Sequence, residues 1–329
     1  MPHTLQPQVI ALLNQLADGK FHSGERLAQQ FGISRSSIFN ALEQAQRLGV
    51  RIQAVRGRGY RLPDPVEWLS ADDIKRWLGG HASRFQFHLH PALPSTNTWL
   101  MERSGVAEPG WVCCAEYQYQ GKGRRGRGWQ AALGGSLVFS VLQRFEAGLA
   151  SLSGLSLAVG LAMARALNRH VRIPVGLKWP NDLVVGPRKL GGILVEVQGD
   201  MDGPALAVIG VGLNVRLPSV AREQIDQAIV DLAELEVSAG RNRLLAECLI
   251  ELEETLAKFK QQGFSGLREA WQELDAYRDR PVALVRPDGT RIHGTACGVD
   301  AAGALLLTDA AGRRAAYSGG ELSLRPVAR

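Results

Sequence analysis

The stretch Gly121-Lys122-Gly123-Arg124-Arg125-Gly126-Arg127-Gly128-Trp129 places four cations and three glycines at seven consecutive positions, 122–128, and ends in a tryptophan. Glycine permits positive φ and lets backbone N–H groups approach a ligand closely. Guanidinium groups between the glycines offer paired donors to phosphate or carboxylate. Such a loop repels itself when it is empty, so we expect it to become ordered around a bound anion.

The sequence on both sides of this glycine–arginine loop, residues 121–129, predicts buried strands. Residues 112–117 and 136–141 are apolar runs of strand length. A basic loop can also be a solvated surface segment or a nucleic-acid-binding tail. Its position between two core strands favours a pocket.

Composition indicates a globular chain of several domains. The 329 residues are 45% hydrophobic and 21% charged, enough for two or three cores. Four scattered cysteines fit a reducing compartment. The N-terminus shows no signal-peptide pattern, and the most apolar run, 152–167, is too short to span a bilayer. We therefore expect a cytoplasmic protein that does not enter a membrane.

Residues 1–65 predict a winged helix-turn-helix. Helix-period apolar positions indicate helices over 7–18, 24–31 and 35–48, and residues 50–62 form a hairpin pattern around a basic tip. This region has eight Lys/Arg against four Asp/Glu, so it carries +4 (8 − 4) of the net charge of +6. A purely structural three-helix domain is the alternative, but the basic hairpin favours DNA binding.

The predicted DNA contacts lie at the start of the third helix and at the hairpin tip. A recognition helix meets base edges and phosphates near its N-terminus. The candidate residues are Ser34, Arg35, Ser36, Ser37, Asn40, Arg56 and Arg58.

Residues 66–277 predict a central mixed-sheet α/β domain. The patterns indicate helices at 71–78, 98–104, 155–170, 225–235, 244–259 and 267–277, and strands that include 85–89, 189–196 and 205–211. Residues 278–329 change to short alternating strands at 282–285, 291–299, 304–307, 314–317 and 321–324. These predict a small C-terminal β-barrel of the SH3-like size class.

Polar groups recur at the strand ends of the central domain. Ser95, Thr96 and Asn97 follow a strand, where they either cap a helix or line a pocket, and Gln118 is similarly ambiguous. Lys178-Trp179-Pro180-Asn181-Asp182 joins two strand-like halves, and Lys189 precedes a glycine pair. A lone lysine such as Lys189 is often only a solvated side chain.

Cations, amides and glycines without a nucleophile suit a reaction between two anions, in which positioning and charge neutralisation matter most. In nucleotidyl transfer, a carboxylate attacks the α-phosphate of ATP and pyrophosphate leaves. Arg124, Arg125 and Arg127 would neutralise phosphates and Lys189 would attract the carboxylate. Asp182 and Asn214 have oxygens suited to Mg²⁺.

These segments together resemble the bacterial bifunctional biotin protein ligase and biotin-operon repressor family. The resemblance covers the chain in order, through Ser95-Thr96-Asn97, the glycine–arginine loop, Lys178–Asp182, Lys189–Leu194, Gly212-Leu213-Asn214 and Gly319–Arg325. The loop and the Lys178–Asp182 segment are specific as a pair. The fold implied for the central domain is that of biotin and lipoate ligases, similar to class II synthetases.

The resemblance implies an ATP- and Mg²⁺-dependent enzyme. It would form biotinyl-5′-AMP and transfer biotin to a lysine of the biotin carboxyl carrier protein of acetyl-CoA carboxylase. Its adenylate-bound homodimer would bind operator DNA as a repressor of biotin synthesis. A ligand-sensing repressor without turnover and a lipoate ligase are the alternatives.

The resemblance also assigns the site residues. Lys189, Arg124 and Asp182 would be catalytic. Biotin would contact Ser95, Thr96, Asn97, Gln118, Lys122, Gly123, Arg124, Lys189 and Gly192. The nucleotide would contact Arg124, Arg125, Gly126, Arg127, Trp129, Lys178, Asn181 and Asn214. The chain departs from the family at Lys122, where arginine is common, and we expect this position to act through its backbone.

Overall fold

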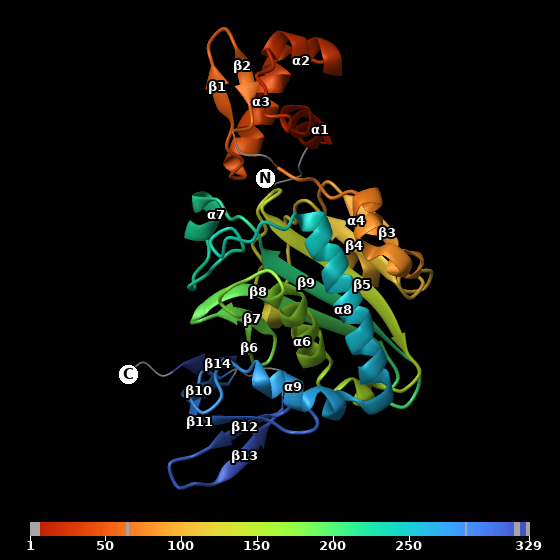
Figure 1. Cartoon of the computed structure of the whole chain (residues 1–329), viewed down its shortest axis with the longest axis vertical. Helices are drawn as coiled ribbons and strands as arrows, with labels where there is room; N and C mark the ends of the chain where they lie inside the picture. Colours follow the sequence, from red (N-terminus) through yellow and green to blue (C-terminus); the bar gives the residue numbers. More distant parts are fainter. Residues whose placement is uncertain (1–6, 64–65, 287, 319–322, 327–329) are drawn as a thin grey trace.

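The computed structural model describes residues 7–63, 66–286, 288–318 and 323–326, and its elements form three groups along the chain (Figure 1). The first group is the predicted winged helix-turn-helix. Its elements are α1 (Pro7–Leu16), α2 (Gly24–Phe31), α3 (Arg35–Arg47), β1 (Gln53–Val55) and β2 (Gly59–Arg61). Ser23 and Ser34 cap α2 and α3, since each side chain accepts a backbone N–H of the first turn.

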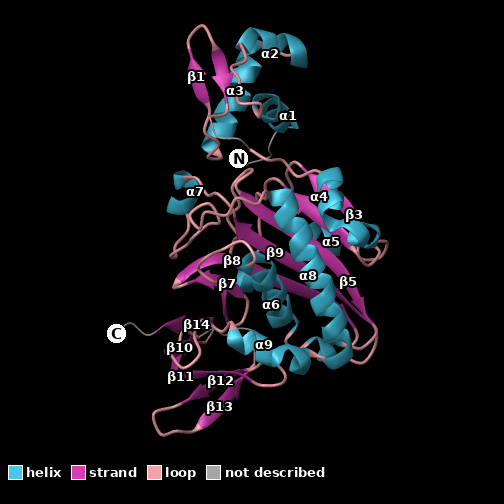
Figure 2. Ribbon diagram, viewed as in Figure 1, coloured by secondary structure: helices cyan, strands magenta, loops and turns pink. Residues whose placement is uncertain are grey.

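The second group is built on a seven-stranded mixed sheet, drawn in magenta in Figure 2. Its strand order is β3-β4-β5-β9-β8-β7-β6, with β3 and β4 parallel and the other pairs antiparallel. The strands are β3 (Gln86–His90), β4 (Trp111–Ala115), β5 (Ser136–Phe145), β6 (Gly176–Lys178), β7 (Asp182–Val185), β8 (Arg188–Gly199) and β9 (Ala205–Asn214).

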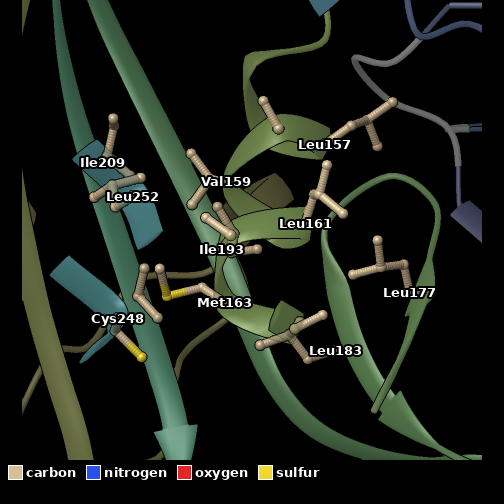
Figure 3. Packing of buried hydrophobic residues seen from close by; sticks show 14 of the residues in the cluster. Leu157, Val159, Leu161, Met163, Leu177, Leu183, Ile193, Ile209, Cys248 and Leu252 are labelled. Atoms are coloured by element: carbon tan, nitrogen blue, oxygen red, sulfur yellow. The ribbon is translucent and has the colours of Figure 1, made fainter. Parts of the chain in front are cut away.

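Helices cover both faces of this sheet. The helices of the second group are α4 (Ala71–Leu78), α5 (Thr96–Met101), α6 (Leu155–Asn168), α7 (Ser219–Glu223), α8 (Arg241–Gln262) and α9 (Arg268–Glu273). Figure 3 shows Val159 and Met163 of α6 next to Ile193 of the sheet, in one cluster with Ile209 and with Cys248 of α8. On the other face, Leu100 of α5 packs in a smaller apolar cluster.

The segment Leu149–Asn168, which includes α6, is long enough and apolar enough to cross a membrane. However, 61% of its most apolar stretch is buried inside the protein. Eleven of the fourteen residues of α6 are buried in the core. This helix is the hydrophobic centre of the second group.

The predicted helix over 225–235 is wrong. This segment is irregular, because its backbone pairs with the sheet instead of with itself. The Lys189 N–H donates to the Ala228 carbonyl (2.9 Å), and the Val230 N–H donates to the Lys189 carbonyl (3.0 Å). The last predicted helix, 267–277, is also shorter, since α9 ends at Glu273.

The third group is an antiparallel five-stranded sheet in the order β13-β12-β11-β10-β14, consistent with the predicted SH3-like fold. Its strands are β10 (Pro281–Val285), β11 (Arg291–Val299), β12 (Leu305–Thr308), β13 (Arg314–Tyr317) and β14 (Ser323–Pro326). Residues 319–322 of the predicted last strand and its motif lie outside the described residues. The predicted boundaries, 1–65, 66–277 and 278–329, stay predictions.

A buried charge pair links α8 to the end of β4, and the segment that follows the winged helix is hydrogen-bonded to its carboxylate. Arg241 Nη2 lies 2.7 Å from Glu116 Oε2, and both side chains are less than 10% exposed. Glu116 Oε1 also accepts the Leu69 N–H at 2.6 Å. Removing one partner of a buried pair leaves an uncompensated charge, so the pair holds Glu116 in place. Because Leu69 is bonded to the same carboxylate, the pair also fixes where the connecting segment enters the central domain.

Candidate active site

The glycine–arginine loop lines a cavity of about 140 Å³ that lies against strands β8 and β9. The lining brings together most of the predicted site residues from segments far apart in sequence. These are Ser95, Thr96, Asn97, Gln118, Lys122, Gly123, Arg124, Arg125, Arg127, Trp129, Lys178, Asn181, Asp182, Lys189 and Gly192.

The segment Ser95–Asn97 both starts a helix and lines the cavity. Helix α5 begins at Thr96, two residues before the predicted start, and Ser95 makes no side-chain capping bond. The backbone N–H and Oγ1 of Thr96 both donate to Gln118 Oε1, at 2.7 and 3.0 Å. The hydroxyl of Thr96 therefore bonds to another residue of the cavity wall and does not cap the helix.

Ser140 of β5 ties this wall together. Its Oγ lies 2.7 Å from Thr96 Oγ1 and 2.6 Å from Asn97 Oδ1, and all three residues are buried. Asn97 Nδ2 donates to the carboxylate of Glu196 at 2.8 Å. A connected set of buried polar groups fixes its members in one arrangement, so the wall presents a defined pattern of donors and acceptors.

Lys122 lies at the outer end of this network. Its side chain is about half exposed, and its Nζ is 3.9 Å from Glu196 Oε1. The Gly210 backbone of β9 lies so close to Asn97 that a Cβ at Gly210 would be 2.2 Å from Asn97 Oδ1. A side chain at position 210 would thus displace the wall.

The glycine–arginine loop folds back on itself. The Gly123 N–H donates to the Arg127 carbonyl (2.7 Å) and the Trp129 N–H donates to the Gly121 carbonyl (2.8 Å). The turn between them places Arg125 at φ 62° and Gly126 at φ 70°, where an arginine is strained and glycine is not. Arg125 and Arg127 are exposed, and Arg124 is directed inward.

Two cations in the cavity are held by the Lys178–Asp182 segment. Lys189 Nζ is 2.7 Å from Asp182 Oδ1, with both side chains less than 20% exposed. Arg124 Nη1 donates to Asn181 Oδ1 at 3.3 Å. Burial lowers the pKa of Arg124, and Arg125 and Arg127 lower it further, although the nearby carboxylate of Asp182 acts in the opposite direction.

Trp129 lies flat against the sheet at the far side of the cavity. A Cβ on Gly212 would be 2.5 Å from its indole ring, so only glycine permits this contact. Lys189 Nζ is 5.7 Å from the ring centroid, within the range of a cation–π contact. An aromatic face beside a fixed cation offers stacking and charge to a nucleotide.

Two predicted residues are placed differently. Gly126 is absent from the cavity lining, because it forms the outer turn of the loop. Asn214 is only 2% exposed and is also outside the lining; its Nδ2 donates to the carbonyls of Val230 (3.1 Å) and Lys189 (3.4 Å). It connects β9 to the irregular segment instead of facing a ligand.

The predicted Mg²⁺ pair does not fit the cavity. Asp182 lines it, but Asn214 does not, and Asp182 Oδ1 is already paired with Lys189. Within the described ranges, no group of three His, Cys, Asp or Glu side chains could hold a metal. Mg²⁺ is usually held by one or two carboxylates together with substrate phosphates, and we derive no step through a protein-bound metal ion.

Some residues that shape the cavity are not among the predicted site residues. Ser140 and Glu196 hold the polar wall, while Gly210 and Gly212 make room for Asn97 and Trp129. The repeat Gly210-Val211-Gly212 inside a strand was a signal, since glycine in a strand marks a close approach. Ser140 gave none, because its neighbours form an ordinary apolar strand.

The predicted DNA-binding residues occupy one end of α3 and the tip of the hairpin. Arg35, Ser36, Asn40 and Arg56 are exposed, and the Ser34 side chain accepts the Ser37 N–H. Arg58 and Arg61 lie over the ring of Phe21, at 4.3 and 4.8 Å from its centroid. These two guanidiniums are therefore oriented by an aromatic ring.

Two family models match the chain, one in the central domain and one in the winged helix. The biotin/lipoate A/B protein ligase family matches residues 89–214, and the HTH domain matches residues 8–61. The chain thus combines a ligase domain of this class with a helix-turn-helix.

Relatives with both parts extend the match over nearly the whole chain. The bifunctional ligase/repressor BirA of Salmonella typhimurium is 40% identical over 96% of this chain and 97% of its own length. The biotin–[acetyl-CoA-carboxylase] ligase of Mycobacterium tuberculosis is 34% identical, covering 80% of this chain and 97% of its own. The chain belongs to the family of bifunctional ligase/repressors.

A solved structure agrees with about three quarters of the chain. The biotin protein ligase from Aquifex aeolicus in complex with biotin and ATP superposes with a TM-score of 0.63 at 28% identity. The match covers 74% of this chain and 99% of the other.

Proposed function

We propose that this chain is a biotin protein ligase whose first step takes place in the described cavity. A carboxylate oxygen of biotin attacks the α-phosphorus of ATP, the bond from that phosphorus to the oxygen bridging the β-phosphate breaks, and pyrophosphate leaves. The product is the mixed anhydride biotinyl-5′-AMP. Two anions must meet for this reaction, so fixed cations are the main requirement of the site.

The observation that carries this proposal is the pair of cations held at one end of a hydrogen-bonded polar wall. Lys189, fixed by Asp182 at 2.7 Å, draws the carboxylate toward phosphorus. Arg124, beside Asn181, neutralises the charge that develops on the α-phosphate.

The polar wall suits the ureido ring of biotin. That ring has one carbonyl acceptor and two N–H donors. Ser95, Thr96, Asn97 and Gln118 offer hydroxyl and amide partners, and Gly123 and Gly192 let the backbone approach. Lys122 contributes mainly backbone contacts, because its amine is directed to Glu196.

The nucleotide occupies the part of the cavity that is lined by Trp129, Arg125, Arg127 and Lys178. Trp129 stacks on the adenine, while Arg125, Arg127 and Lys178 neutralise phosphates. Mg²⁺ enters with ATP, because in nucleotide sites it binds largely through the substrate phosphates.

The second step transfers biotin to a protein. The ε-amine of a lysine on the biotin carboxyl carrier protein attacks the carbonyl carbon, the bond to AMP oxygen breaks, AMP leaves and the amine loses a proton. A lysine amine has a pKa of about 10.4 when unperturbed, and Asp182 is our candidate to receive that proton.

The winged helix makes the same chain a repressor. We propose that the adenylate-bound form dimerises and places two recognition helices on a two-fold symmetric operator of biotin synthesis genes. Both roles place the protein in the cytoplasm.

The test of the ligase is pyrophosphate release from Mg-ATP by the full chain, with biotin, with lipoate and with neither acid. Release that depends on biotin supports the proposal. Release with lipoate alone would make the chain a lipoate ligase. Binding of biotin without release would leave a ligand-sensing repressor and would contradict catalysis.

A further inference from the structure

One apolar side chain interrupts the polar face of the recognition helix α3. Phe39 is 50% exposed, and in the described part of the winged helix, residues 7–63, it is the only large hydrophobic side chain that is exposed. The helix is held to its domain by its other face, where Ile38, Ala41 and Leu42 are buried. A single exposed apolar residue is ordinary on a protein surface, so its meaning depends on where it lies.

Phe39 lies one turn beyond the polar N-terminus of α3. Residues three and four apart are neighbours on a helix surface, so Phe39 adjoins Ser36 and Arg35, and both are exposed. A helix-turn-helix places this part of its second helix in the major groove. Phe39 is thus an apolar group within a surface built for hydroxyl, amide and cation contacts.

The rest of the protein does not cover Phe39, which stays half exposed. The C-terminal end of α3 approaches the central domain, where Pro218 lies against Gly49. Phe39 lies eight residues before the end of α3 at Arg47, which is about 12 Å at 1.5 Å per residue. Another phenylalanine of the winged helix, Phe21, is instead covered by the guanidinium groups of two hairpin arginines.

The major groove offers one apolar group on the edges of the unmodified bases, the C5-methyl of thymine. We propose that Phe39 contacts a thymine methyl in each half-site and is a specificity-determining residue of this repressor. This inference rests on the proposed DNA-binding function. It adds the identity of one base that the repressor recognises in each half-site. The neighbouring Arg35 and Ser36 position the helix through phosphates and polar base edges.

The experiment begins by selecting binding sites from random duplexes with the full-length protein, supplied with biotin and Mg-ATP, and in parallel with Phe39→Ala. We expect the wild-type site to contain one thymine per half-site whose preference the variant loses. That thymine is then replaced by uracil, which removes only the methyl group. Wild-type affinity should fall about tenfold per half-site, in the range of one base contact, while the variant should bind both duplexes equally.

Three controls isolate the methyl contact. Phe39→Leu, which keeps an apolar side chain, should retain part of the thymine preference. Biotin-dependent pyrophosphate release should be unchanged in Phe39→Ala, because position 39 is outside the catalytic cavity. The salt dependence of binding should also be unchanged, since no phosphate contact is removed.

The possible outcomes distinguish a failure of the Phe39 contact from a failure of the repressor function. If the wild-type protein enriches no sequence, the repressor function and the role of Phe39 both fall. If it enriches a site in which uracil replaces every thymine without loss, or if Phe39→Ala weakens binding equally to all sequences, only the role of Phe39 is overturned.

Discussion

The cations of the cavity and those of the winged helix differ in how the protein holds them. Lys189 is less than 20% exposed and is fixed by Asp182, whereas Arg35 and Arg56 are exposed at the protein surface. A fixed cation stabilises charge at one point, as a reaction requires. Exposed cations suit a phosphate backbone, which binds through many weak, salt-dependent contacts. The two regions therefore use the same residue types for different purposes.

The largest effect should come from removing the fixed cation. Lys189→Ala should lower kcat/KM for adenylation by about 10²–10³, the usual loss of a group that stabilises transition-state charge. Pyrophosphate release at saturating and limiting biotin measures it. The matched control is Arg188→Ala on the same strand, whose partner is Glu234 outside the cavity. Equal losses in the two variants would mean that position 189 acts only through folding.

Arg124→Gly should loosen the intermediate. Charge-assisted hydrogen bonds contribute about 1.5–3 kcal/mol, so biotinyl-5′-AMP should leave roughly 10–100 times faster and should modify exposed lysines of bystander proteins. Rapid filtration with labelled adenylate measures the release. Arg124→Lys, which keeps the charge but not the paired donors, should be intermediate. Retention equal to the parent in Arg124→Gly would refute the role.

Ser140→Ala tests the polar wall. The change removes the hydroxyl between Thr96 and Asn97 and leaves buried groups unpaired, which costs about 1–3 kcal/mol. We expect the Kd of biotin to rise about tenfold with little change in kcat. Ser151→Ala is the control, because Ser151 donates to the Gly148 carbonyl away from the cavity. Unchanged biotin affinity in Ser140→Ala would show that the wall does not bind the ligand.

The smallest effect is expected at the hairpin. Arg58→Ala should reduce the slope of log K against log salt by about 1 and weaken binding to all sequences alike. Arg278→Ala removes an exposed cation outside the winged helix and should leave the slope as it is. A loss confined to particular sequences would make Arg58 a base contact instead.

The sequence was sufficient for the three-part architecture and for most residues of the cavity. The alternation of glycine and arginine and the Lys178–Asp182 segment are local signals, so the composition of the wall could be inferred. The pairing of Lys189 with Asp182 could not, because it depends on the register of β7 and β8. Ordering of the glycine–arginine loop by a bound anion stays a prediction.

One prediction is wrong for a physical reason, and one predicted residue lies away from the cavity. Residues 225–235 have helix-period apolar residues, but their backbone hydrogen bonds go to Lys189, and tertiary pairing overrides local pattern. Asn214 has a suitable side chain for a ligand, yet burial directs it to backbone carbonyls. Ser140 was missed because a buried serine in an apolar strand shows its role only when its partners are known.

The most direct test is the exchange of labelled pyrophosphate into ATP, which reports the reversible formation of an acyl-adenylate and nothing later. Full-length protein should exchange label only when biotin is present, and Lys189→Ala should lose the exchange while Arg188→Ala keeps it. Exchange that is independent of biotin, or that survives unchanged in Lys189→Ala, would contradict a carboxylate activated by the fixed cations of this cavity.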